Sequence, residues 1–265
     1  MAWRAAQAGV PRVVGWTRER GEGVEALRRG AIHDLATSPA QAARAAELVV
    51  LAVPPAATLE FLSSLRQALR PGARLTDVAS VKRVVLERAA AEGLGGRFCG
   101  GHPLAGTHRT GFLAARSDLF AGAIVYVCPT GTDEGEATAH AVAGFWREVA
   151  GAHPVRIDAS EHDAQLAWTS HLPQAVASAL AVTLAERDLG ALSFGTGGRD
   201  TTRLAASDAG LWTDILLQNA GPVADAVTGA GERLARLADL LRRGDRAGLR
   251  AFLERGATFR KGIER

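Results

Sequence analysis

The sequence predicts an α/β domain followed by an all-α domain, with the α/β domain built as a Rossmann-like, doubly wound sheet. Up to about Asp158, short apolar runs alternate with helical patterns, which is typical of a parallel sheet covered by helices. Beyond Asp158 only helix-type periodicity remains. The chain has 265 residues, of which 47% are hydrophobic and 22% charged, enough for two domains with ordinary cores. We expect the first domain over residues 1–158 and the helical domain over residues 159–265.

The candidate strands are short apolar runs. They are Arg12–Thr17, Leu48–Val53, Arg74–Asp77, Arg97–Gly100, Ala123–Cys128 and His153–Ile157. The helical stretches between the first four runs are Gly23–Arg29, Pro39–Ala46, Pro55–Leu69 and Val81–Ala91. Ser38 before Pro39 is typical of a helix N-terminus. In the second half, helical periodicity covers Glu161–Glu186, Leu211–Leu241 and Arg246–Arg255.

The start of the chain departs from the usual plan of such a domain. A dinucleotide-binding half begins with a strand, a glycine-rich turn and a helix, whereas Met1–Gly9 is typical of the end of that helix. We therefore expect the first strand and its G-x-G-x-x-G turn to be missing, either because the true start lies upstream or the chain was cut, or because the chain never had them. That strand normally lies in mid-sheet, so two strand edges should be unpaired.

Composition excludes several classes of protein. The formal net charge is +3 and the arginines are scattered, so no basic block predicts a nucleic-acid interface. No apolar run reaches the roughly 18–20 residues of a membrane helix, and no signal-peptide pattern opens the chain. Cys99 and Cys128 are too few for a disulfide framework or a four-ligand zinc site. We expect a reducing, cytoplasmic location and no metal.

The segment Glu161-His162-Asp163 contains residue types that bind metals. Because adjacent residues point to different faces of a helix, we expect these three to be surface groups.

Two blocks of the first domain combine reactive side chains with strand ends. His102 lies in Gly100–Thr107, where glycines allow the backbone to approach a ligand closely. It also follows a strand end, where ligands bind in α/β sheets; a lone histidine is otherwise more often structural. Ser80 lies between a strand and a helix, where it can cap the helix, face the same crevice, or both.

The helical half offers a second histidine, His171, and a pair of arginines, Arg199 and Arg203, one helical turn apart. Two guanidinium groups on one face suit a substrate with two carboxylates. Taken alone, such a pair is usually a solvated face.

In this order, the blocks DVASVK, GGHPLAGT, SHLP and RDTTRLAASDAGLW resemble the prephenate/arogenate dehydrogenase family, the oxidative decarboxylases of tyrosine biosynthesis. The resemblance spans about Arg12 to Asn219. It implies a nucleotide-binding domain, a helical dimerisation domain and a homodimer. It also implies oxidative decarboxylation of prephenate to 4-hydroxyphenylpyruvate, or of arogenate to tyrosine, with hydride transfer to NAD or NADP.

The resemblance also implies residue roles. His102 would accept the proton of the substrate's ring hydroxyl, and Ser80 would hydrogen-bond near that histidine and the nicotinamide. His171, Thr107, Arg203 and Arg199 would bind the substrate, with Arg203 on a carboxylate and Arg199 in support. Two residues depart from the family pattern. His108 stands where some members carry Glu, and Gln174 stands where many prephenate-preferring members carry His, so the choice of substrate stays open.

The segment after the first candidate strand bears on the cofactor. NAD-using folds place an acidic residue at this strand end to bind the ribose hydroxyls, but Gly15–Arg18 contains none. Thr17 with Arg18 suits a 2′-phosphate, so we expect NADP, with NAD as the alternative; Arg18 is equally compatible with a surface charge. The resemblance places Val53, Pro54 and the segment from Ser80 to Lys82 beside the cofactor.

The implied chemistry is physically coherent. A neutral imidazole, with a reference pKa of about 6.5, suits proton acceptance near pH 7. Hydride leaves the same carbon as the hydroxyl proton departs, and loss of CO₂ makes the ring aromatic. Tight binding of the departing carboxylate would only stabilise the ground state. We therefore expect Arg203 to govern substrate binding more than the chemical step.

Two alternatives remain. One is another two-domain NAD(P) dehydrogenase of the β-hydroxyacid type, which would be expected to use a lysine of the helical half; this half has none before Lys261. The other is a catalytically silent, truncated homodimer. The apolar stripe near Leu234–Leu241 favours dimer formation but is also compatible with a core.

Overall fold

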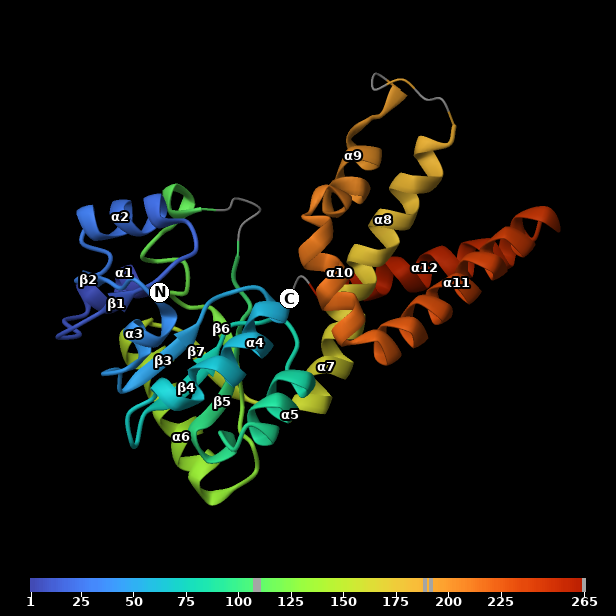
Figure 1. Ribbon diagram of the computed structural model, residues 1–265. Coiled ribbons are helices and arrows are strands. Elements are labelled where there is room, and N and C mark those ends of the chain that lie inside the picture. The colour runs from blue at the N-terminus through green and yellow to red at the C-terminus, as the bar shows by residue number, and fades with distance from the viewer. Residues whose placement is uncertain (107–110, 188–189, 191–192, 264–265) are drawn as a thin grey trace. The chain divides into compact units, whose positions relative to one another are not determined.

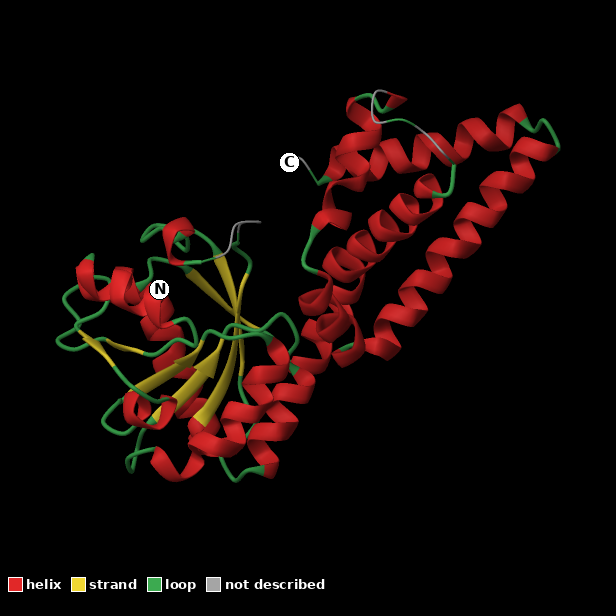
Figure 2. Ribbon diagram, turned by 45° about the horizontal axis from the view of Figure 1, so that its top comes forward, coloured by secondary structure: helices red, strands yellow, loops and turns green. Residues whose placement is uncertain are grey.

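The protein consists of two compact units (Figure 1). The computed structural model describes residues 1–106, 111–187, 190 and 193–263. One unit comprises Met1–Leu166 and Ser207–Asn219, and the other comprises Ala167–Ala206 and Ala220–Arg265. In the described part of the chain, all strands belong to the first unit, and the second contains helices only (Figure 2).

The first unit contains two sheets. In the smaller one, β1 (Val14–Gly15) pairs with β2 (Asp34–Leu35) in parallel. The larger sheet has the order β3-β4-β5-β6-β7. Its strands are β3 (Leu48–Leu51), β4 (Arg74–Asp77), β5 (Phe98–Pro103), β6 (Ile124–Cys128) and β7 (His153–Arg156). All six runs predicted as strands therefore contain one, and β2 was not predicted.

The larger sheet is mixed rather than purely parallel. The pairs β3–β4, β4–β5 and β6–β7 are parallel, but β5 and β6 are antiparallel. The expectation of a parallel sheet is therefore wrong for one pair. A parallel neighbour requires a long crossover connection, whereas an antiparallel one does not. The described part of the β5–β6 connection contains only the 3₁₀ turn η3 (Phe112–Ala114).

The expected break in the sheet is present. β1 and β3 belong to different sheets. Each has one edge that no strand of the described residues pairs with. The run predicted as a strand over Arg12–Thr17 keeps only two residues of strand.

Figure 2 shows helices beside the sheets of the first unit. The helices that belong to this unit are α1 (Ala2–Gln7), α2 (Arg20–Arg28), α3 (Pro39–Ala43), α4 (Pro55–Leu65), α5 (Arg83–Ala91), α6 (Asp133–Gly144), α7 (Ala159–Leu166) and α10 (Ala209–Gln218). The predicted cap is confirmed, since the Gln41 N–H donates to Ser38 Oγ at 3.1 Å. Short 3₁₀ turns η1 (Arg66–Ala68) and η2 (Gly95–Arg97) and a π-helical turn η4 (Phe145–Val149) complete the unit.

Apolar side chains fill both faces of the larger sheet. Leu62, Leu75 and Phe98 belong to a core cluster that joins β3, β4 and β5 to α4 and α5. Trp146 is the centre of a second cluster with Val125 and Val142. Burial on both faces explains the continuous apolar run of β6, in which Val125–Cys128 are all buried.

The second unit is a helical bundle. It contains α8 (Leu172–Ala185), α9 (Thr196–Thr202), α11 (Ala220–Arg242) and α12 (Arg246–Gly262), with the π-helical turn η5 (Ala167–His171) and the 3₁₀ turn η7 (Arg203–Ala206). α8 packs against η5, α9, η7 and α11, and α11 packs against α12. Among the residues described, no helix is both long and apolar enough to cross a bilayer.

Candidate active site

The predicted site residues of the first unit gather at one edge of the sheet. β3, β4 and β5 are parallel neighbours, so their carboxyl ends share that edge, where ligands bind in α/β folds. Val53 and Pro54 follow β3, Ser80 follows β4, and His102 lies near the end of β5. The structure thus brings the proposed cofactor segments and the proposed proton acceptor to the same edge.

A buried ion pair holds the residue before His102. Lys82 Nζ pairs with Asp77 Oδ2 and also donates to the Gly101 carbonyl at 2.9 Å. Asp77 Oδ1 accepts the Gly101 N–H at 3.0 Å. The N–H and the carbonyl of Gly101 are therefore both hydrogen-bonded. Asp77, at the end of β4, accepts from the N–H, and Lys82, which follows β4, donates to the carbonyl. The Lys82 side chain is fully buried in this pair and supports the strand; its expected place beside the cofactor stays a prediction.

The glycines before His102 are closely packed within the first unit. A Cβ on Gly101 would lie 2.6 Å from the Asp77 carbonyl oxygen, and one on Gly100 would lie 2.8 Å from Leu86 Cδ1. Packing within the first unit therefore accounts for these two glycines, and the close approach of a ligand stays a prediction. Because glycine has no side chain, β5 can pack closely against β4 at Gly101 and against α5 at Gly100.

His102 belongs to a chain of three buried polar side chains. His102 Nδ1 lies 2.8 Å from His162 Nε2, and His162 Nδ1 lies 2.7 Å from Asp163 Oδ1. The exposed fractions of the three residues are 8%, 0% and 2%. The expectation that His162 and Asp163 are surface groups is wrong.

The sequence did contain a signal for this burial. Ala159, His162, Asp163 and Leu166 are all buried and recur at helical spacing, so they share one side of α7. The three-residue segment alone does not reveal this face, because adjacent residues of a helix point in different directions. The spacing of His162 and Asp163 relative to Ala159 and Leu166 places all four on the buried side of α7.

Asp163 also caps the helix that follows β4. Its carboxylate oxygens accept the N–H groups of Lys82 and Arg83 at 2.8 and 2.9 Å, at the N-terminus of α5. Burial alone would raise the pKa of Asp163, but the hydrogen bonds from His162, Arg83 and Lys82 outweigh it, and the pKa lies below the ordinary value. Asp163 is therefore an anion that accepts hydrogen bonds. No side chain of the preceding segment caps α5, so the suggestion that Ser80 does so is wrong.

Two further side chains surround His162. The Tyr126 ring lies edge-on to the His162 ring, with centroids 5.5 Å apart, and Gln165 Nε2 donates to Tyr126 Oη at 2.6 Å. Asn219 Nδ2 donates to the Asp163 carbonyl at 2.7 Å. The Tyr126 contacts hold α7 on β6, and the Asn219 contact joins α7 to the end of α10.

The remaining cofactor candidates lie between β1 and α2. Thr17 is half-buried and Arg18 is exposed. The preceding Trp16 contacts Phe61 of α4 edge-on, with ring centroids 5.6 Å apart. This contact brings the end of β1 to the helix that begins after Val53 and Pro54.

The helical unit carries the candidates for substrate binding. Arg199 lies in α9 and Arg203 opens η7, and both are exposed. Arg199 Nε donates to the Phe194 carbonyl at 3.1 Å. His171 is fully buried at the end of η5, which favours indirect support over contact with a substrate.

Gln174 is buried, and its Nε2 donates to the Leu204 carbonyl at 2.9 Å. Thr107 and His108 lie outside the described residues.

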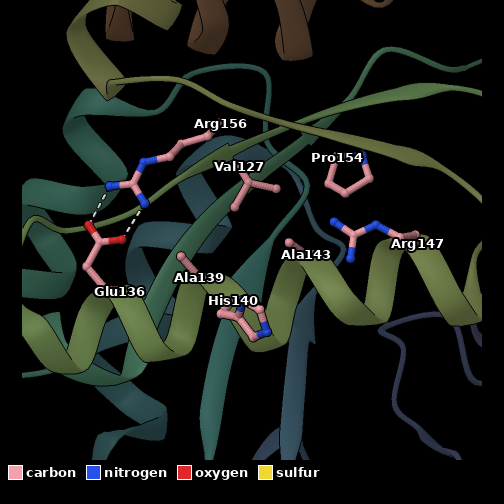
Figure 3. A pocket seen from close by; sticks show the side chains of 8 residues that line it. All are labelled: Val127, Glu136, Ala139, His140, Ala143, Arg147, Pro154 and Arg156. Atoms are coloured by element: carbon pink, nitrogen blue, oxygen red, sulfur yellow. Dashed lines mark hydrogen bonds and ion pairs between the residues drawn. The ribbon is translucent and has the colours of Figure 1, made fainter.

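A hollow of about 280 Å³ is lined mainly by residues of α6 and β7, and Figure 3 shows their side chains. The Arg156–Glu136 ion pair spans it at one end, and His140 and Arg147 line it from the helix side. None of the site residues expected from the sequence lines this hollow. It is therefore separate from the edge of the sheet that carries His102.

Cys99 and Cys128 lie on the neighbouring strands β5 and β6 as buried free thiols. Burial raises the pKa of Cys128 to about 12 and also raises that of Cys99. Both thiols are therefore protonated near neutral pH and chemically inert.

A nucleotide-binding sheet with a buried imidazole at its carboxyl edge, followed by a helical unit, is the architecture of a two-domain NAD(P)-dependent oxidoreductase. Residues 4–155 match the model of the prephenate dehydrogenase nucleotide-binding domain, and residues 158–255 match that of the prephenate dehydrogenase dimerization domain. The chain belongs to the prephenate dehydrogenase family. The resemblance expected from the sequence motifs is confirmed.

Several known proteins are similar along most of their length. A prephenate dehydrogenase from Lactococcus lactis subsp. cremoris is 31% identical over 95% of this chain and 70% of its own. The crystal structure of Aquifex aeolicus prephenate dehydrogenase in complex with hydroxyphenyl propionate and NAD+ is 28% identical, with a TM-score of 0.89, covering 99% of this chain and 93% of that one. Synechocystis arogenate dehydrogenase is 26% identical, with a TM-score of 0.81 and coverages of 99% and 95%.

Proposed function

We propose that this chain catalyses oxidative decarboxylation of prephenate or arogenate, with His102 as the proton acceptor. The observation that carries the proposal is the position of His102, which lies at the carboxyl edge of the sheet and is hydrogen-bonded through Nδ1 to a buried partner. An imidazole held in this way presents its other nitrogen in a fixed direction. Relatives of this chain include both prephenate and arogenate dehydrogenases.

The residues at the carboxyl edge fit a dinucleotide cofactor. Val53 and Pro54 leave β3 at the start of α4, and the Thr17 hydroxyl with the exposed Arg18 guanidinium follows β1. A cation beside a hydroxyl suits a 2′-phosphate, so we propose NADP, with NAD as the alternative. The nicotinamide supplies the hydride acceptor when bound. Ser80, half-buried after β4, is proposed to hydrogen-bond near His102 and this ring.

The reaction requires little more of the chain than position and charge. His102 takes the proton of the ring hydroxyl as hydride leaves the same carbon, and loss of CO₂ from the opposite carbon gives an aromatic phenol. Arg203, supported by Arg199, is proposed to bind a substrate carboxylate, for which a guanidinium provides two parallel donors. Thr107 is proposed to contribute to the same binding. His171 is proposed to support it from its buried position.

A direct assay tests this function. The purified chain is incubated with prephenate or with arogenate, each with NADP+ or NAD+, and both cofactor reduction and the aromatic product are measured. We expect 4-hydroxyphenylpyruvate from prephenate, or tyrosine from arogenate, and a lower KM for NADP+ than for NAD+. A folded chain that produces neither product contradicts the function. A titration that detects no binding of either cofactor would favour the silent homodimer.

We also propose that the protein is a homodimer in the cytoplasm. The helical unit exposes large apolar side chains on α11 and α12, including Leu234, Leu241 and Phe259, and exposed apolar patches mark interfaces. The family model that covers this unit describes a dimerization domain. Two thiols that form no disulfide support a reducing compartment. Recovery of the protein in the cytosolic fraction of its cell would check the location.

A further inference from the structure

The histidine and carboxylate behind His102 form a hydrogen-bonded chain with a defined direction. We infer that His162 and Asp163 are positioning residues, which hold His102 as the tautomer that carries its lone pair on Nε2. The inference rests on the proposed function, in which His102 accepts a proton. It assigns a role to two residues that the sequence had suggested were surface groups.

The direction of the chain is set at Asp163. Three hydrogen bonds end on its carboxylate: from the Lys82 N–H, the Arg83 N–H and the ring of His162. The N-terminus of α5 also favours negative charge at this point. An ionised carboxylate has only acceptors, so the proton between Asp163 and His162 belongs to His162 Nδ1.

The direction of the hydrogen bond between His162 and His102 follows from that of the bond between His162 and Asp163. A neutral imidazole with a proton on Nδ1 has its lone pair on Nε2. His162 Nε2 is therefore an acceptor, and the 2.8 Å contact requires that His102 Nδ1 donates to it. His102 then carries a proton on Nδ1 and a lone pair on Nε2. This is the form that can accept the hydroxyl proton.

The same chain stabilises the charge that develops during the reaction. When His102 Nε2 takes the hydroxyl proton, the ring becomes an imidazolium whose Nδ1–H still points to His162. The negative charge of Asp163 lies two hydrogen bonds away in a site from which water is excluded, where electrostatic interactions are strong. The same logic, in which an acid fixes the tautomer of a base and stabilises its cation, governs catalytic triads.

Both ends of the chain are anchored before a substrate arrives. Asp163 is held by the α5 N-terminus and by Asn219. His102 lies on β5, and the backbone of Gly101, the residue before it, is hydrogen-bonded to Asp77 and Lys82. The correct tautomer therefore requires no rearrangement during the reaction.

Substitutions at His162 test the inference by kinetics. His162→Leu removes both hydrogen bonds, whereas His162→Gln keeps an amide oxygen that can accept from His102 Nδ1. We expect kcat to fall about 100-fold in the leucine variant and about 10-fold in the glutamine variant, with KM changed less than about threefold. His140→Leu and His140→Gln are the matched controls, because they make the same changes at an exposed histidine in the hollow on α6 that is separate from this edge of the sheet; their kcat should be unchanged.

Three kinetic outcomes would overturn the inference. The first is a His162→Leu enzyme with wild-type kcat, the second is an equal loss in the leucine and glutamine variants, and the third is a loss confined to KM. Thermal unfolding of each variant distinguishes loss of the fold from loss of the tautomer.

A second readout needs no activity. Nitrogen NMR of the histidine-labelled wild-type chain reports which ring nitrogen of each histidine carries the proton, and a His162→Gln spectrum assists assignment. We expect His102 and His162 both to be protonated on Nδ1. A His102 ring protonated on Nε2 would overturn the inference even in an active enzyme. If the wild-type chain proved inactive on both substrates, the proposed function would fail while this measurement still decided the tautomer.

Discussion

The position of Gly101 is constrained by its neighbours on β4. A Cβ at this residue would lie 2.6 Å from the Asp77 carbonyl oxygen and 3.0 Å from Thr76 Oγ1. Both atoms belong to a buried strand that is paired on each side, so neither can move without disturbing the sheet. The close packing of β5, the strand that carries His102, against β4 therefore requires a residue without a Cβ at position 101.

We expect Gly101→Ala to lower the free energy of unfolding by about 1–3 kcal/mol, because the added methyl group forces β4 and β5 apart. Denaturant titration measures the change. Gly106→Ala is the control, since a Cβ there meets no atom of the described residues within 4 Å, and it should change stability by less than about 0.5 kcal/mol. Equal stability of Gly101→Ala and the wild type would refute the packing argument.

The binding role proposed for Arg203 predicts how KM and kcat change when its guanidinium is removed. If its guanidinium binds a substrate carboxylate equally in the ground and transition states, removing it raises KM and leaves kcat nearly unchanged. We expect Arg203→Ala to raise KM about 10- to 100-fold and to lower kcat by less than about threefold. Steady-state kinetics measure both. The control is Arg187→Ala, another arginine of the helical unit, and a loss mainly in kcat would contradict the assigned role.

At the scale of elements, the N-terminus of α5 depends on a residue far away in the sequence. Asp163, on α7, accepts the first N–H groups of α5 and also holds His162. One carboxylate thus couples two helices and the hydrogen-bonded chain that ends at His102. The pKa of this carboxylate is lowered in the fold.

The lowered pKa predicts how stability depends on pH. A carboxyl group with a depressed pKa in the folded state contributes stability above its unfolded pKa, and this contribution is lost as the pH falls through the folded pKa. We expect Asp163→Asn to be less stable than the wild type at pH 7, with the difference shrinking below about pH 4. Urea titrations across this range measure it. Asp118→Asn, which removes an exposed charge, should show a small difference throughout; a difference at Asp163 that is independent of pH would contradict the assignment.

Most elements were predictable because their signals are local. The apolar runs and the Ser38-Pro39 cap predicted strands and a helix start that the structure contains. The antiparallel β6 was not, since the direction of a strand depends on its connection rather than on its own residues. α6 was not predicted either, although Thr132 caps it and acidic residues fill its first turn.

The candidate site was predictable only in part. His102 and Ser80 could be found because they lie at strand ends in distinctive blocks. The roles of His162 and Asp163 depend on contacts over 60 and 81 residues of sequence, which no local pattern contains. The burial of Lys82 depends in part on such a contact as well, because the Gly101 carbonyl that it binds lies on another strand.

At the scale of the whole molecule, the helical unit leaves much apolar surface uncovered. A groove of about 430 Å³ runs along it, lined by Trp168, Val176, Leu234 and Phe252 among others. Leu234 is 61% exposed. Apolar surface of this kind is costly in water, and we propose that a second copy of the chain covers it.

We expect the wild-type protein to have twice the 27.7 kDa mass of one chain in light-scattering or sedimentation measurements. Leu234→Asp should shift the protein toward the monomer, because association would bury an unpaired charge. Leu113→Asp is the control, as this leucine is 79% exposed in the other unit, and it should leave the mass unchanged. A dimer unaffected by Leu234→Asp would place the interface elsewhere.

If His102 accepts the proton lost by the substrate, its imidazole should be essential for turnover. The kcat of His102→Asn is measured with prephenate and with arogenate, using the preferred cofactor. We expect kcat to fall about 100- to 10,000-fold, with KM within about threefold of the wild type. A variant that retains more than about a third of the wild-type kcat would show that another group accepts the proton.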